Sequence, residues 1–376
     1  MTESNDDLAV KQKRTENPRR ATLSDVAREA GVSAVAVSVV LNGTKTGTRV
    51  SEASRQRITA AAQRLRYTPN QAARSLARGQ SKVVGIVLGH LRPLSAGTHD
   101  LGNEYTLFVI EGITAACGER GYHLFVFTNP WRETPEALEI LRDRRTDGLI
   151  LLAPPADTRI LSDLCAVNVP FVCVGNPAEG LGVSTVDIDD VRGTRLALEH
   201  LYALGHRRIA HILGPPTASS PRRRLASYRE WLAEAAIPNR PEYEVEGYPV
   251  GIYGEEGVAV MRENVRKLLA LPEPPTAIFA CDDSLAVKVI DEATKAGFAV
   301  PERLSVVGFD DRPMASIITP PLTTIRQPMV QIGYIAANTL IDQLEAEHSG
   351  TEAPAPRAVH MTPELMVRQS TAPPRY

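Results

Sequence analysis

Two aspartates follow apolar runs that are typical of buried strands. Asp282 comes after AIFAC, and Asp310 ends the run LSVVGFD. Open α/β sheets collect ligands at the carboxyl ends of their strands. Both carboxylates are therefore candidates for binding a small molecule, and a salt bridge is the alternative role for Asp310.

The sequence lacks the common signatures of enzymes and metal sites. None of G-x-S-x-G, Walker A, H-E-x-x-H or G-x-G-x-x-G occurs. His206, in LGHRRIAHI, is expected to be a structural residue before a strand, because nothing near it completes a catalytic triad. The scattered cysteines are expected to be core residues in a reducing cytoplasm: Cys117, Cys165, Cys173 and Cys281. We therefore expect no cofactor, no metal and no enzyme activity.

The segment from Thr22 to Leu41, TLSDVAREAGVSAVAVSVVL, has the pattern of two short helices joined by a tight turn. Thr22 and Asp25 can form a capping box, Gly31 can end a first helix, and Ser33 can cap a second one. The apolar residues fall at helical spacing: Val26, Ala27, Ala30, Val37, Val40 and Leu41. The pattern predicts a helix-turn-helix, whose second helix can lie in the major groove of DNA, and an ordinary helical hairpin is the alternative.

Charge is distributed unevenly along the chain. Residues 1–82 carry 15 Lys and Arg against 7 Asp and Glu, whereas the rest carries 27 against 37. A basic head on an acidic body favours contact of the head with a polyanion.

The elements that position these residues divide into four regions. Residues 1–20 are polar and predicted to be disordered, and residues 21–67 form the helix-turn-helix domain, with a third helix from about Ser51 to Leu65. Residues 68–81 contain PNQAARSLARG, a hinge helix and linker too short to be stable without a partner.

From Lys82 onward, apolar runs alternate with helical patterns, which predicts parallel sheets covered on both faces. Residues 82–376 are therefore expected to form two Rossmann-like lobes with a ligand cleft between them. The 376 residues contain no apolar run of the roughly 20 residues that span a membrane, and no secretory signal, so a cytoplasmic protein is expected.

The order of these elements resembles the lactose-repressor (LacI/GalR) family of bacterial transcription regulators over residues 20–376. The stretches that carry the resemblance are YTPNQAARSLARGQS, LEHLYALGHRRIAHILGP, AIFACDDSLA, AGFAVPERLSVVGFDD and PPLTTIRQP. It implies a type I periplasmic-binding-protein-like body in a homodimer that binds a pseudo-palindromic DNA operator, with binding controlled by a small effector. It also implies three chain crossings, with lobe one at 82–182 plus 327–345, and lobe two at 183–321 plus the C-terminal segment.

On the DNA side, the resemblance places Ser33 at a phosphate-binding helix cap, with Thr22 and Asn42 as further backbone contacts. Ala34 and Val35 stand at positions that often read bases, while Ala36 and Val39 replace a Thr and an Arg of many relatives. No residue on this face offers a bidentate contact to a base, although apolar contact with thymine methyl groups is open to it. Specificity is therefore expected to depend on Ser38, Asn42, DNA shape and the hinge.

The loop after the second helix and the hinge complete the expected DNA contacts. Lys45 and Arg49, in GTKTGTR, are expected to contact phosphates. The resemblance identifies Leu76 as a wedge inserted into the minor groove, with packing between hinge helices as the alternative. The remaining residues of the matching segment are Tyr67, Asn70, Ala73 and Ala77.

On the effector side, the resemblance places Arg224 in the cleft, where its fork of donors suits hydroxyl, carboxylate or phosphate groups. A salt bridge, at the surface or between the lobes, is the alternative for Arg224 and Asp310. The other candidates are Asn103, Tyr105 and Asp282. Gly175 stands where many relatives have Asp, and the longer loop from Leu88 to Tyr105 is interpreted as a lid or a structural insertion.

Three classes of function compete for this sequence. An effector-controlled repressor is favoured, with a sugar or sugar derivative as the expected effector. A solute-binding protein fits the two lobes but not the basic head, and a nucleotide-dependent enzyme lacks a phosphate-binding loop. No motif identifies the operator, the target genes or the effector. No motif shows whether the effector releases DNA or strengthens DNA binding.

Overall fold

The computed structural model describes residues 20–43, 48–70, 74–75, 79–88, 104–127, 134–248 and 254–375. The chain divides into two compact units, Met1–Ser81 and Lys82–Tyr376. Within these described ranges, no helix combines the length and the apolar character needed to cross a membrane.

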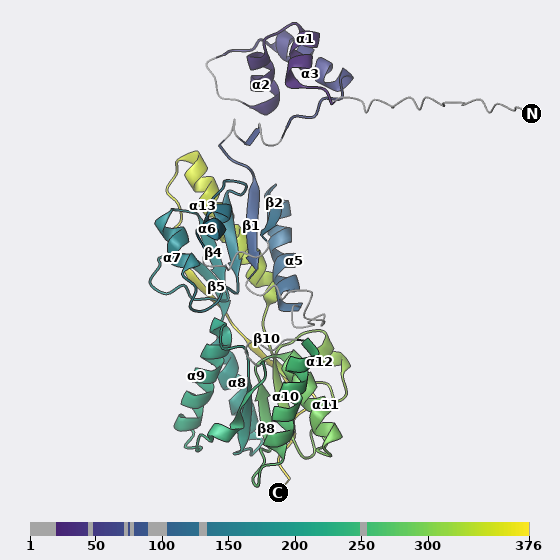
Figure 1. The fold of residues 1–376 in the computed structure, drawn as a ribbon, viewed down its shortest axis with the longest axis vertical. Coiled ribbons are helices and arrows are strands. Elements are labelled where there is room, and N and C mark those ends of the chain that lie inside the picture. The colour runs from purple at the N-terminus through teal and green to yellow at the C-terminus, as the bar shows by residue number, and fades with distance from the viewer. Residues whose placement is uncertain are drawn as a thin grey trace, which may run out of the picture. The chain divides into compact units, whose positions relative to one another are not determined.

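The described part of the N-terminal unit includes the helices α1 (Leu23–Ala30), α2 (Ala34–Asn42) and α3 (Glu52–Arg64), which confirms the predicted helix-turn-helix (Figure 1). The Thr22 side chain accepts from the Asp25 amide and the Asp25 side chain accepts from the Thr22 amide, so the capping box is present. Gly31 ends α1 with a φ of 63°, and the Ser33 hydroxyl accepts from the Ala36 amide at 3.2 Å. Val26, Val37 and Ile58 are fully buried between the three helices.

The second unit contains two six-stranded sheets, one in each lobe (Figure 1). The sheet of lobe one has the strand order β11-β5-β4-β3-β1-β2, and its pairs are all parallel. Its strands are β1 (Val83–Leu88), β2 (His123–Phe127), β3 (Gly148–Leu152), β4 (Phe171–Val174), β5 (Ser184–Ile188) and β11 (Ala358–Met361). Its helices are α5 (Glu104–Glu119), α6 (Pro135–Leu141), α7 (Ile160–Ala166) and α13 (Met329–Ser349).

Lobe two repeats this plan with the order β12-β10-β9-β8-β6-β7, in which only the β10–β12 pair is antiparallel among the described pairs. Its strands are β6 (Ile209–Leu213), β7 (Glu244–Glu246), β8 (Ala277–Ala280), β9 (Ser305–Asp310), β10 (Thr323–Arg326) and β12 (Glu364–Met366). Its helices are α8 (Asp190–Ala203), α9 (Ser219–Glu234), the 3₁₀ turn Pro241–Tyr243, α10 (Gly254–Leu269), α11 (Asp283–Lys295) and α12 (Met314–Ile317).

Each sheet is covered by helices on both faces. In lobe one, α5 and α13 pack on one apolar face and α6 and α7 on the other. In lobe two, α10 and α11 cover one face and α8 and α9 the other. Burial on both faces explains why most of these strands are continuous apolar runs.

The expected lobe boundaries were wrong in two places. Residues 184–188 form β5 and residues 358–361 form β11, and both strands belong to the sheet of lobe one, where they pair with each other. The chain therefore crosses between the lobes at Asp189, at Gln327–Pro328 and at Thr362–Pro363. Each crossing is only one or two residues long.

Candidate ligand site and nucleic-acid interface

A cavity of about 160 Å³ is lined by residues of both lobes. Tyr105 and Asp187 come from lobe one, and Arg224, Asp282, Asp310 and Arg312 come from lobe two. Four of the five predicted effector-site residues therefore lie together, and Asn103 lies outside the described residues. A larger hollow of about 310 Å³ is an open groove on α3, lined by Glu52, Arg55 and Gln56 among others, and it contains none of the predicted site residues.

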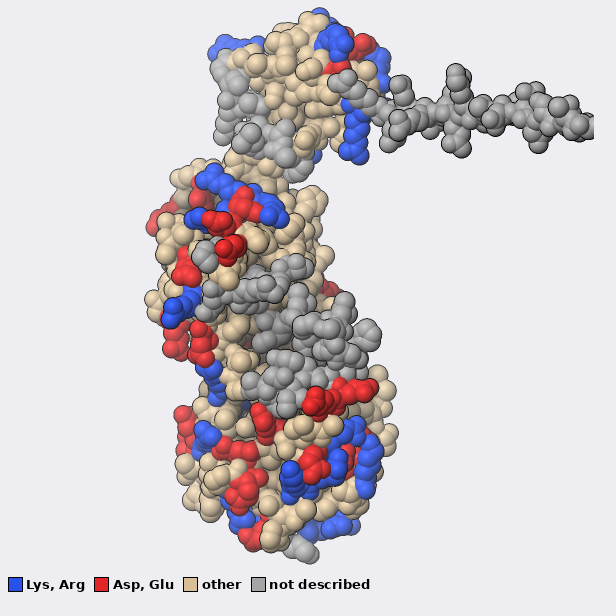
Figure 2. All heavy atoms as spheres, in the orientation of Figure 1, with Lys and Arg blue, Asp and Glu red and all other residues tan. Residues whose placement is uncertain are grey.

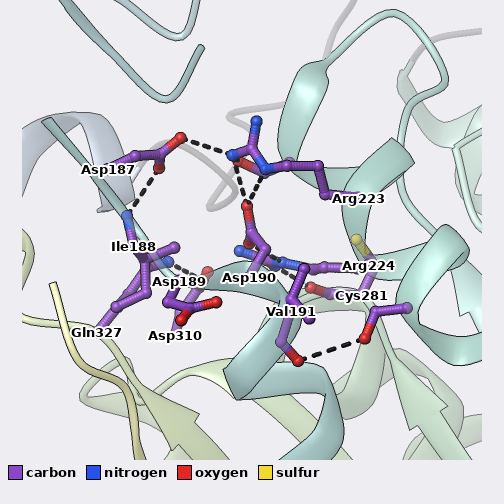
Figure 3. Close-up of polar contacts among 12 residues, drawn as sticks. Asp187, Ile188, Asp189, Asp190, Val191, Arg223, Arg224, Cys281, Asp310 and Gln327 are labelled. Atoms are coloured by element: carbon purple, nitrogen blue, oxygen red, sulfur yellow. Dashed lines mark hydrogen bonds and ion pairs between the residues drawn. The ribbon is translucent and has the colours of Figure 1, made fainter. Parts of the chain in front are cut away.

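Arg224 is held by three contacts in lobe two. Its Nε donates to Oδ1 of Asp190 at 2.7 Å, its Nη1 donates to the carbonyl oxygen of Cys281, and its guanidinium lies 3.5 Å from the centre of the Phe309 ring (Figure 3). The side chain is buried. Arg224 thus combines a salt bridge within lobe two with a place on the cavity wall, and its orientation is fixed before any ligand binds.

Asp310 ends β9 with a φ of 125°, a backbone conformation that non-glycine residues seldom adopt. Its Oδ1 accepts from Nε2 of Gln327, and its Oδ2 accepts from Nε of Arg312 at 2.8 Å. Burial raises the pKa of Asp310 above its ordinary value, and the guanidiniums of Arg312 and Arg224 oppose that rise. The surrounding donors thus hold this carboxylate in one position at the cavity wall.

Asp282 caps the first turn of α11, where its Oδ1 accepts from the Leu285 amide at 2.9 Å. Its Oδ2 accepts from the Tyr248 hydroxyl at 3.0 Å. Asp282 is therefore both the cap of a helix and a residue of the cavity wall.

Gly175 lies next to the Tyr105 hydroxyl on the cavity wall. A Cβ on Gly175 would lie 3.7 Å from the Tyr105 hydroxyl oxygen, and its φ of 77° favours glycine. Enclosure raises the pKa of the Tyr105 hydroxyl, and the carboxylates of Asp187 and Asp310 raise it further. The hydroxyl therefore stays protonated and can donate a hydrogen bond at neutral pH.

A buried charge cluster beside the cavity was missed by the sequence analysis. Nη2 of Arg223 donates to Oδ2 of Asp187 and to Oδ2 of Asp190, both at 2.6 Å (Figure 3). Burial, and then the neighbouring Asp190 carboxylate, raise the pKa of Asp187 to about 7. Arg312, which holds Asp310, was also missed. The sequence features that could have revealed the Arg223 cluster are the acidic run VDIDD and the three arginines of SSPRRRLASY.

His206 has the structural role that the sequence predicted. Its Nδ1 lies 2.9 Å from Oγ1 of Thr276, and its Nε2 lies 3.0 Å from Oγ of Ser305 and 2.9 Å from the Ala372 carbonyl oxygen. Burial lowers the pKa of His206 to about 4. The described residues contain no group of His, Cys, Asp or Glu that could hold a metal ion.

In the N-terminal unit, the start of α2 presents Ser33, Ala34 and Val35 at the surface, and half of Val35 is exposed. Ser38 and Val39 are half-buried. Asn42 is buried, and its Nδ2 donates to Oγ of Ser38 at 3.2 Å.

The other predicted DNA contacts lie at several places in this unit. Thr22, Arg49 and Asn70 are exposed, and half-buried Tyr67 packs against the helical core. In the view of Figure 2, this unit carries more blue Lys and Arg side chains than red Asp and Glu. The remaining predicted contacts lie outside the described residues: Lys45, Ala73, Leu76 and Ala77.

Comparisons with known proteins agree with both parts of the chain. Residues 22–70 match the family of bacterial regulatory proteins described as lacI, and residues 198–371 match a periplasmic binding protein-like domain. The chain is 31% identical over 356 residues to the transcriptional repressor CytR of Escherichia coli K12, covering 93% of this chain and 96% of CytR. It is 29% identical over 352 residues to the repressor PurR of Haemophilus influenzae, covering 93% of this chain and 98% of PurR.

Two solved structures extend the likeness to three dimensions. One is the lac repressor dimer bound to operator and the anti-inducer ONPF, with 28% identity over 94% of this chain and 100% of that chain, and a TM-score of 0.75. The other is a complex of the transcriptional regulator CelR with cellobiose, with 30% identity over 93% of this chain and 100% of that chain, and a TM-score of 0.64.

Proposed function

We propose that this protein, which belongs to the lacI family of bacterial regulatory proteins, represses transcription by binding an operator as a homodimer. One helix-turn-helix reads half of a DNA site, so a two-fold dimer fits a pseudo-palindromic operator. The exposed start of α2, with Ser33 at its cap, supports this assignment. Access to chromosomal DNA places the activity in the cytoplasm.

We propose that a sugar or sugar derivative binds in the cavity and controls operator affinity. The observation that carries this proposal is the convergence of Tyr105, Arg224, Asp282 and Asp310 on one cavity lined by both lobes. A ligand that touches both lobes binds one lobe arrangement better than another, and that difference is what shifts an equilibrium. The solved CelR relative holds cellobiose, which favours a carbohydrate. We assign no catalytic role to the cavity.

The DNA-binding proposal is tested by fluorescence anisotropy with DNA from upstream of the protein's own gene, over a salt series. The full-length chain is expected to bind this DNA more tightly than random DNA. Leu76→Ala is expected to remove that preference and leave the salt-dependent, non-specific binding, because a wedge acts on the DNA and not on phosphate charge.

Lys45→Ala with Arg49→Ala gives the matched electrostatic test. The slope of log K against log salt is negative, and loss of two phosphate contacts should make it shallower by about 1.8, at roughly 0.9 per contact. An unchanged slope would show that this loop does not touch the DNA backbone. If the wild-type chain showed no salt-dependent binding to any DNA, the regulator function itself would be wrong.

A further inference from the structure

Two segments from different lobes meet along one side of the cavity. Residues 153–157 follow β3 in lobe one, and residues 215–222 comprise the loop before α9 and the first turn of α9 in lobe two. Several cavity-lining residues belong to them: Ala153, Pro154, Pro215, Ala218, Ser220 and Pro221. We call the contact between these two segments the inter-lobe seam.

Backbone pairing forms the first part of the seam. Pro155 and Ala218 make an isolated antiparallel bridge, and the Ala156 amide donates to the Thr217 carbonyl oxygen at 2.8 Å. Ala218 stands at the N-cap of α9 and provides no side-chain hydrogen bond there. The approach to α9 is therefore tied to the other lobe through backbone groups.

A surface ion pair forms the second part. Arg222 donates from Nη1 to Oδ1 of Asp157 at 2.8 Å and from Nη2 to Oδ2 at 2.5 Å. Its Nε donates to the carbonyl oxygen of Pro216, which holds the guanidinium against its own segment. The two-pronged geometry fixes Arg222 on Asp157, although both side chains remain accessible to solvent.

A buried ion pair next to the seam joins the same helix to lobe one. Arg223 reaches Asp187 at the end of β5, in lobe one, and Asp190 at the start of α8, in lobe two. The side chain of Asp187 is 7% exposed and that of Asp190 is fully buried. Two buried carboxylates repel each other, so Arg223 offsets the repulsion that would otherwise separate these elements.

We propose that the seam and Arg223 form a latch that holds the lobes closed without an effector. Three kinds of contact join the start of α9 to lobe one: a backbone bridge and a surface ion pair to residues 153–157, and a buried ion pair to Asp187. Because the seam contributes to the cavity wall, the latch must part on that side before a ligand can exchange there. Only this last step, effector exchange, rests on the proposed function.

Hydrogen exchange at the Ala156 amide measures the latch directly in the full-length chain. This amide hydrogen donates across the seam, and Pro154 and Pro155 have no amide hydrogen, so a peptide covering 153–158 contains few other reporters. Arg222→Ala is expected to speed its exchange about two- to fivefold, the effect of losing an exposed ion pair. Arg223→Gln is expected to speed it tenfold or more, because two buried carboxylates then lose a shared partner.

Arg229→Ala is the matched control. Arg229 also lies on α9 and also makes a two-pronged ion pair, but its partner is Glu244, within lobe two. This variant is expected to leave Ala156 exchange unchanged, and none of the three variants should change exchange in the buried strand β6.

Three results would overturn the latch. They are an unprotected Ala156 amide in the wild-type chain, equal exchange in the wild-type and both latch variants, or an increase in Arg229→Ala as large as in Arg222→Ala. The measurement contains neither DNA nor effector, so failure of the latch and failure of the regulator function are separate outcomes.

Discussion

Ala34 and Val35 stand exposed at the start of α2 without a charge or an amide, whereas the cavity is lined by three carboxylates and two guanidiniums. On α2, water is displaced only when DNA arrives, and no side chain has to be held in place beforehand. In the cavity, charges are largely removed from water, so each must be fixed by a partner. The two surfaces therefore differ in preorganisation: the charged side chains of the cavity are held by partners, and the exposed start of α2 is small and apolar.

The largest expected effect comes from removing a fixed cation of the cavity. Arg224→Leu leaves the Cys281 carbonyl oxygen without this donor and Asp190 with one guanidinium fewer. We expect the free energy of unfolding to fall by about 3–5 kcal/mol, as for a broken buried ion pair. Urea denaturation followed by circular dichroism measures this loss.

Arg229→Leu is the matched comparison, because its ion pair with Glu244 lies near the surface. The loss should stay below about 1 kcal/mol. Equal losses of unfolding free energy in the two variants would show that a buried ion pair at the cavity contributes no more to stability than one near the surface.

A buried neutral group should give the next largest effect. Burial lowers the pKa of His206 to about 4, against about 6.5 in the unfolded chain. Between these values the unfolded chain binds a proton that the folded chain does not, so stability is lost as the pH falls. The loss in free energy of unfolding reaches about 2.5 kcal/mol at pH 4.5.

His206→Gln should therefore flatten the dependence of the unfolding free energy on pH between 7 and 4.5. The exposed His348, in the last turn of α13, provides the control. If His348→Gln flattened the curve as much as His206→Gln, the assignment of the pH dependence to burial would fail.

The smallest expected effect separates the two faces of α2. Val37 is fully buried and Val35 is half exposed. Val37→Ala should destabilise the N-terminal unit by about 2 kcal/mol, measured by hydrogen exchange of the α3 amides. Val35→Ala should change this stability by less than about 0.5 kcal/mol.

For DNA affinity, we expect the opposite ranking, with the larger direct effect from Val35→Ala. Val35→Ala should weaken operator binding about fivefold, because apolar contact with thymine methyl groups is lost. If Val35→Ala left operator affinity unchanged, the apolar face of α2 would have no part in reading the site.

The sequence predicted the local parts of this molecule well. The Thr22 and Ser33 caps and the turn at Gly31 depend on residues within a few positions, so spacing was enough to find them. Apolar runs such as Val83–Leu88 and Ser305–Asp310 predicted strands correctly, because both faces of their sheets are buried.

The failures arose where tertiary contact decides. β5 contains the polar residues Ser184, Thr185 and Asp187, and β11 is a sheet-edge strand with alternating exposure, so neither shows a continuous apolar run. The sequence identified Asp282 and Asp310 at strand ends, but it missed the pair of Arg223 with Asp187, because 36 residues separate them. Each of the three consecutive arginines meets a carboxylate, and which carboxylate each one meets is set by the rotation of α9, which composition does not encode.

The order of strands has a consequence for how the protein is made. β11 and β12 form one edge of each sheet, and both come from residues 358–366, near the end of the chain. During synthesis, lobe two can bury much of its core while its sheet, like that of lobe one, still lacks an edge strand. Both sheets are completed by the same short segment, residues 358–366. A chain cut before residue 358 would lose an edge strand from each lobe at once, so one segment decides whether the sheets on both sides of the ligand cavity are complete.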